Sequence, residues 1–64
     1  MKYILEIDCD NDAFQAASLN EELARILTEV VERINDGDGV AVGFDMGLYD
    51  TNGNKVGTAR LINE

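Results

Sequence analysis

The chain has 64 residues, with 13 acidic residues against five basic ones, no histidine and one cysteine, so its formal net charge is −8. A chain this short predicts a single domain over residues 1–64. One cysteine excludes an intramolecular disulfide, and cysteine and histidine together are too few for a common structural zinc site. The N-terminal apolar run is too short and too acidic for a signal peptide or a membrane span, so we expect a cytoplasmic protein with no membrane partner.

Residues 2–8 predict the first strand, because apolar and polar side chains alternate along them. Tyr3, Leu5 and Ile7 share one face of this strand. The polar residues 9–17 predict a connection with a turn that tucks Phe14 inward.

Residues 19–36 predict one amphipathic helix, because apolar side chains recur there at spacings of three and four. Ser18 and Glu21 fit a capping box at its start, and Gly37 suits the left-handed residue that follows many helices. The apolar stripe consists of Leu19, Leu23, Ile26, Leu27, Val30, Val31 and Ile34.

Residues 40–62 predict a β-hairpin, with a first strand over 40–50 and Asn52-Gly53 as a two-residue type I′ turn. That turn sets the register, in which Asp50 lies opposite Lys55 as one of two cross-strand ion pairs. The other pair is Asp45 with Arg60. The inner face of this hairpin then carries Phe44, Met46, Leu48, Ala59 and Leu61.

These elements predict an α+β fold of the order β-α-β-β. We expect a three-stranded, mainly antiparallel sheet with the helix packed on one face. The third strand is expected in the middle of the sheet, antiparallel to both neighbours.

Two acidic segments, residues 8–12 and 50–54, have the alternating oxygen ligands that open a calcium-binding loop. Neither fits further, because the required glycine is replaced by Ala13 in one and Lys55 in the other. Without histidine, and with Ser18 assigned to a helix cap, a nucleophilic triad is excluded in practice. We therefore expect no metal site, no cofactor, no catalytic residues and no enzyme activity.

Some acidic residues have a structural role in the predicted fold. Glu21 and Glu22 lie in the first helical turn within reach of Arg25, and Glu29 can pair with Arg33.

Other acidic residues oppose local stability and are candidates for partner binding. Glu32 and Asp36 are like charges four residues apart, and Asp36 and Asp38 follow the helix C-terminus, where the dipole disfavours anions. A second candidate row comes from the first strand and the connection after it, where alternate residues lie about 6.6–6.8 Å apart. This row consists of Glu6, Asp8 and Asp10, with Asp12 beside it.

The outer face of the predicted sheet is a further candidate surface. Ile4, Tyr49, Val56 and Ile62 form an apolar centre there with a charged rim, which suits a protein contact or a homodimer. Tyr49 is therefore counted with the acidic residues as a partner-binding candidate, and the protein is expected to be a monomer or a homodimer.

Three segments carry a resemblance to a known family: residues 10–14 (Asp-Asn-Asp-Ala-Phe), residues 23–27 (Leu-Ala-Arg-Ile-Leu) and residues 48–57, which contain Asp-Thr-Asn-Gly-Asn. They resemble small phage and prophage proteins, most of which have no assigned function. In its acidity the chain is similar to the anti-CRISPR proteins among them, including those that act on type I systems.

The resemblance implies an acidic inhibitor, in the cytoplasm of a host bacterial cell, that mimics nucleic acid and blocks the DNA-binding surface of a CRISPR effector complex. The implied partner is a basic, DNA-reading subunit, with no direct contact to nucleic acid. The alternative is a small dimeric interaction or assembly protein of phage origin whose charge confers only solubility.

Overall fold

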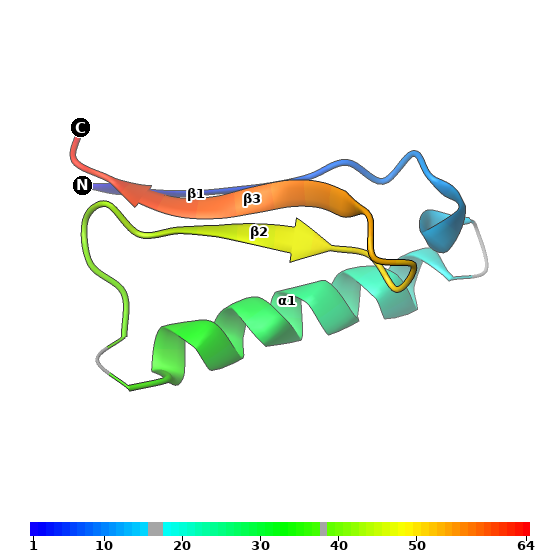
Figure 1. Ribbon diagram of the computed structural model, residues 1–64, viewed down its shortest axis with the longest axis horizontal. Coiled ribbons are helices and arrows are strands. Elements are labelled where there is room, and N and C mark those ends of the chain that lie inside the picture. Colours follow the sequence, from blue (N-terminus) through cyan, green and yellow to red (C-terminus); the bar gives the residue numbers. More distant parts are fainter. Residues whose placement is uncertain (16–17, 38) are drawn as a thin grey trace.

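The computed structural model describes residues 1–15, 18–37 and 39–64. A three-stranded antiparallel sheet forms one layer, in the order β1-β3-β2, and one helix forms the other (Figure 1). The predicted α+β class, the β-α-β-β order and the central third strand are thus confirmed. The elements are β1 (Lys2–Ile7), the 3-10 helix η1 (Asp12–Phe14), α1 (Leu19–Asn35), β2 (Asp45–Tyr49) and β3 (Lys55–Ile62).

The core lies between the sheet and α1. The predicted inner face of β1 packs against this core, and Phe14 is buried as expected. Asn11 positions η1, because its side-chain oxygen accepts a hydrogen bond from the backbone amide of Ala13 at 3.1 Å. The buried core residues are Ala13, Phe14, Ile26, Val30, Leu48, Val56 and Ala59.

α1 ends at Asn35, one residue before the predicted end, and its start differs from the predicted capping box. The side chain of Ser18 makes no cap hydrogen bond; its carbonyl oxygen accepts from the amide of Glu22 at 2.9 Å. Gly37 has the expected positive φ of 55°.

The predicted pair of Glu29 with Arg33 is wrong. Glu29 accepts instead from Arg25 at 2.9 Å, and the guanidinium of Arg33 lies 5.3 Å from the ring centroid of Phe44. Stacking on an aromatic ring partly desolvates the arginine, which makes the cation–π contact competitive with an exposed ion pair.

The predicted hairpin register is confirmed along most of its length, with Asp45 opposite Arg60, but the predicted ion pair between these two described side chains does not form. The first strand is shorter than predicted, because β2 begins only at Asp45. Ahead of it, the amide of Phe44 bonds the carbonyl of Ala41 at 2.9 Å, and Gly43 has a φ of 97°. This turn takes residues 40–44 out of the strand.

The predicted type I′ turn is wrong, because Asn52 does not have the positive φ that this turn needs. A β-bulge between Leu48 and Tyr49 shifts the register, so Tyr49 rather than Asp50 lies opposite Lys55. The loop therefore spans residues 50–54. Asp50 is buried instead of pairing across the strands.

Because of the same bulge, the predicted outer face of the sheet is wrong at Val56. Val56 was expected to be exposed there, but it is buried in the core. An extra residue in one strand reverses the alternation locally, so a side chain expected on one face turns toward the other.

Candidate acidic partner-binding surfaces

Glu22 ties the start of α1 to the β2–β3 loop. One of its carboxylate oxygens accepts from Nε of Arg25 at 2.8 Å, and the other accepts from the backbone amide of Thr51 at 2.7 Å. Arg25 also donates to the carbonyl oxygen of Tyr49 at 2.9 Å. One buried carboxylate and one guanidinium therefore hold the helix against the end of β2.

Asp50 organises the loop from within. Its Oδ1 accepts from the amides of Asn52 at 2.9 Å and Asn54 at 2.8 Å. Its Oδ2 accepts from the side chains of Asn11 at 2.7 Å and Asn54 at 3.2 Å. The Asn11 contact joins the loop to the connection after β1, 39 residues away in the sequence.

These contacts shift the acidities of the groups involved. The hydrogen bond from Arg25, followed by that from the Thr51 amide, lowers the pKa of Glu22 below its ordinary value of 4.5. Burial would raise the pKa of Asp50, but the bonds from Asn54, Asn11 and Asn52 outweigh it and lower that pKa below 3.8. The pKa of Arg25 is raised, chiefly by its hydrogen bond to Glu22.

The fold should therefore lose stability in acid, below about pH 4.5. Both carboxyl pKa values are lower in the folded chain, so the unfolded chain binds protons more readily and the stabilisation is complete only above 4.5 and 3.8. It is lost as the pH falls through the lower, folded values. Chemical denaturation measured from pH 7 to pH 2.5 should show this decline.

Glu22→Gln is the variant that checks this pH dependence. It should be less stable than the natural chain at pH 7, and the difference should shrink in strong acid. A difference that stays constant with pH would contradict the assignment.

The anchoring network consists of Asn11, Glu22, Arg25, Asp50 and Thr51. Within it, the predicted contact of Glu22 with Arg25 is confirmed, but the contacts to the β2–β3 loop and between Asp50 and Asn11 were not predicted. Asp50 offered a local signal, because an aspartate before a Thr-Asn-Gly turn can accept from amides two residues on. Glu22 offered none, since its partner in the loop lies 29 residues away. The carboxylates of this network are occupied by the chain's own donors, so they are not partner-binding groups.

Glu32 lies in the last turn of α1, and Asp36 is the C-cap that follows the helix. Both are exposed, and we call them the helix row. Within the described residues neither forms an ion pair. The two arginines of α1 are engaged elsewhere, Arg25 with Glu22 and Glu29 and Arg33 with Phe44. Asp38, predicted to extend this row, lies outside the described residues.

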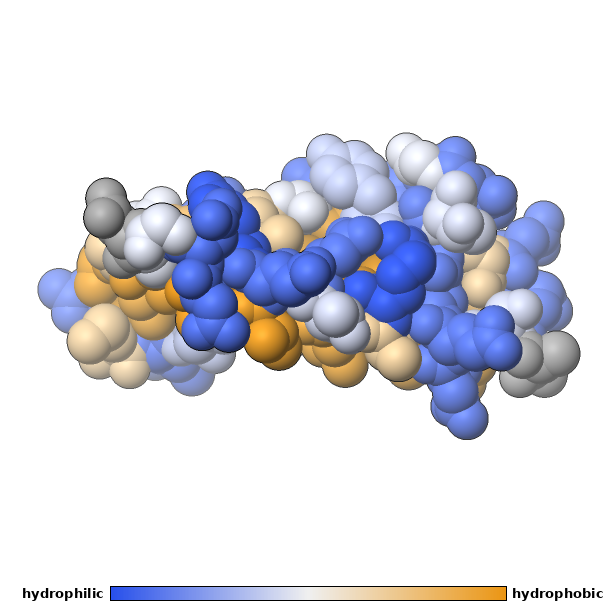
Figure 2. Space-filling model, turned by 90° about the horizontal axis from the view of Figure 1, so that it is seen from below, coloured by the Kyte–Doolittle hydropathy of each residue, from blue (hydrophilic) through white to orange (hydrophobic). Residues whose placement is uncertain are grey.

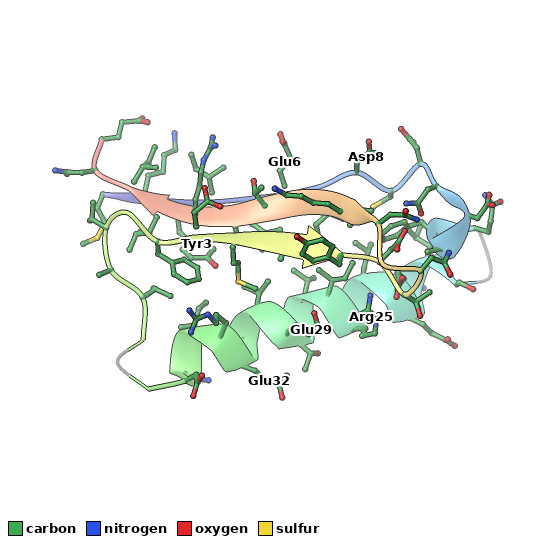
Figure 3. All side chains as sticks on the ribbon, viewed as in Figure 1. Tyr3, Glu6, Asp8, Arg25, Glu29 and Glu32 are labelled. Atoms are coloured by element: carbon green, nitrogen blue, oxygen red, sulfur yellow. The ribbon has the colours of Figure 1, made fainter. Side chains whose placement is uncertain are left out.

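Glu6 and Asp8 are exposed on the other side of the molecule. Figure 3 shows both side chains pointing away from α1, whereas Glu32 points away from the sheet. Asp10 and Asp12 follow them and are exposed too; the amide of Asp10 donates to Asp8 at 3.1 Å. The predicted acidic residues thus form two surfaces, and one flat partner surface can meet only one of them.

Tyr49 lies on the outer face of the sheet and is half exposed. Its ring covers Gly47, where an added Cβ would meet the ring atoms at 3.0–3.3 Å. The other apolar residues expected here, Ile4 and Ile62, are half-buried, and Val56 is buried. The apolar centre of the outer face is therefore smaller than predicted.

Among the described residues, no three cysteine, aspartate or glutamate side chains converge as metal ligands. The described part of the chain also has no helix that is both long and apolar enough to cross a membrane. A scan against models of protein families finds no match, and searches of curated proteins and of solved structures find no match either.

Proposed function

We propose that this protein is an acidic inhibitor that mimics nucleic acid and occupies the DNA-binding surface of a CRISPR effector complex, such as a type I complex. The helix row is the observation that supports this most directly. Glu32 and Asp36 are exposed, lack a basic partner among the described residues, and lie where the helix dipole disfavours anions. Charges that do not serve the fold are available to a basic partner.

The helix row places two carboxylates at the same end of α1. Glu32 lies in the last turn of the helix, and Asp36 is the C-cap, where the backbone becomes extended. Lysine and arginine side chains that bind the phosphates of DNA can bind exposed carboxylates instead.

A competition experiment tests the proposal. A purified type I effector complex is bound to labelled target DNA, and the protein is added while fluorescence anisotropy reports the bound fraction. We expect the protein to displace the DNA, and we expect its affinity for the complex to fall as salt increases, because screening weakens contacts between opposite charges.

The double variant Glu32→Lys/Asp36→Lys should weaken displacement by about tenfold or more, which corresponds to about 1.4 kcal/mol of binding energy. The matched control is Asp10→Lys/Asp12→Lys, which changes the net charge equally on the other surface and should retain most of the activity. Equal losses in both variants would show that net charge acts without a defined surface. Full activity of the helix-row variant would exclude that row.

A further inference from the structure

One flank of α1 exposes apolar side chains that the chain itself leaves uncovered. Leu27, Val31 and Ile34 are 42%, 55% and 39% exposed, and their spacings of four and three residues place them on the same side of the helix. Figure 2, which views the molecule from the helix side, shows hydrophobic surface at the left and lower middle, beside the hydrophilic surface that runs across the centre. We call these three residues the apolar flank.

The apolar flank lies on the β1 side of the molecule. The opposite flank of α1 is bonded to the end of β2 and the loop after it, through Arg25 to Tyr49 and Glu22 to Thr51. Since β1 and β2 are the two outer strands of the sheet, the apolar flank is turned toward β1.

β1 is also an open edge. Asp8 donates to the carbonyl of Val56 at 2.7 Å, so the even-numbered residues of this strand direct their backbone groups toward β3. Tyr3, Leu5 and Ile7 therefore direct their amides and carbonyls outward, where an added strand can bind them.

We propose that a second copy of this chain pairs with β1 in antiparallel orientation, making a six-stranded sheet in which the two apolar flanks cover each other. Only odd-numbered residues have free backbone groups, so they must lie opposite odd-numbered residues of the other copy. A two-fold axis at Ile4 satisfies this condition and sets Tyr3 opposite Leu5 of the second copy.

Charge complementarity within β1 favours that register. With the axis at Ile4, Lys2 lies opposite Glu6 of the second copy, and the pair occurs twice by symmetry. A shift of the second copy by two residues would place Ile4 opposite Glu6, and Lys2 opposite Asp8, which lies beyond the end of β1. Lys2 is free to change partner, because its present contact with Glu64 is a 3.4 Å pair between two mostly exposed side chains.

The shape of the chain suits a contact along its length. The chain measures 35 × 23 × 17 Å, so a second copy that lies along β1 and α1 meets it over its longest dimension.

The proposed dimer does not rest on the proposed function, and the effect of salt distinguishes the two proposals. Two chains of charge −8 repel each other, so added salt should strengthen the dimer. The same salt should weaken binding of the helix row to a basic partner. The helix row and the dimer contact have no residue in common, so either proposal can fail alone.

Sedimentation equilibrium of the full chain, in 50 mM and 500 mM salt, tests the dimer. We expect about twice the mass of 7.0 kDa, with tighter association at the higher salt. Val31→Glu should weaken association by about tenfold or more, because it places a charge in the apolar contact. Thr28→Glu adds the same charge elsewhere on α1 and should leave association within about twofold.

The register has its own test. Glu6→Lys should weaken the dimer, and Lys2→Glu/Glu6→Lys should restore it, because the exchanged charges again lie opposite each other. Amide exchange at Tyr3 and Leu5 should slow as protein concentration rises.

A monomer at millimolar concentration in both salts would overturn the proposal. So would a dimer that Val31→Glu does not weaken. A dimer broken by Tyr49→Ala instead would assign the contact to the outer face of the sheet.

Discussion

Asp50→Ala is expected to lower the melting temperature by roughly 10 °C or more, the largest loss for any carboxylate of this chain. The aspartate accepts four hydrogen bonds, two from loop amides and two from the side chains of Asn11 and Asn54. Alanine leaves all four donors without their acceptor in a partly desolvated site. Thermal unfolding followed by circular dichroism measures the loss.

Two further variants show whether the loss of stability comes from the hydrogen bonds that Asp50 accepts. Asp50→Asn should be intermediate, because it keeps one acceptor oxygen but presents an amide to donors that need an acceptor. Asp45→Ala removes an exposed carboxylate from the start of β2 and should change the melting temperature little. Similar losses for Asp45→Ala and Asp50→Ala would contradict an organising role for Asp50.

Gly57→Ala is the second substitution with a large expected effect. Gly57 lies opposite Ile7 in the β1–β3 pair, and a Cβ added to it would overlap the carbonyl oxygen of Glu6. Glycine in a strand commonly marks such a close backbone approach. Because the obstacle is backbone rather than a movable side chain, β1 must shift away from β3.

We expect Gly57→Ala to reduce the free energy of unfolding by about 2–3 kcal/mol. At roughly 0.05–0.15 kcal/mol per residue, a chain of this length has about 3–10 kcal/mol in total. Urea denaturation measures the change. Gly47→Ala is the matched control, because its added Cβ meets only the side chain of Tyr49, which can rotate away, and an equal loss there would contradict the backbone argument.

The two proposals assign different parts of the surface to different partners. In these proposals the helix row binds a basic protein, and β1 and the apolar flank bind a second copy. A dimer would then present two helix rows, and an effector complex with repeated DNA-binding subunits could engage both, which raises the apparent affinity without new contacts.

The sequence by itself determined the elements and most of their faces. The four-residue spacing of Ile26 and Val30, within an apolar stripe of helical period, predicted their place against the sheet, and alternation predicted the inward side of β1. These signals are local, since the period of a helix or strand decides which side chains share a face. The α+β class followed from the same patterns, whereas the order of the strands in the sheet is set by no local period.

The tertiary structure alone decided how the polar groups are used. Glu22 meets Thr51 across 29 residues and Asp50 meets Asn11 across 39, so no local pattern could predict that these acids anchor the fold. The bulge that buries Val56 arises where the anchored loop joins the hairpin. Which acidic residues remain available to a partner depends on these long-range contacts, because each arginine or amide can satisfy only the carboxylates that the fold brings within its reach.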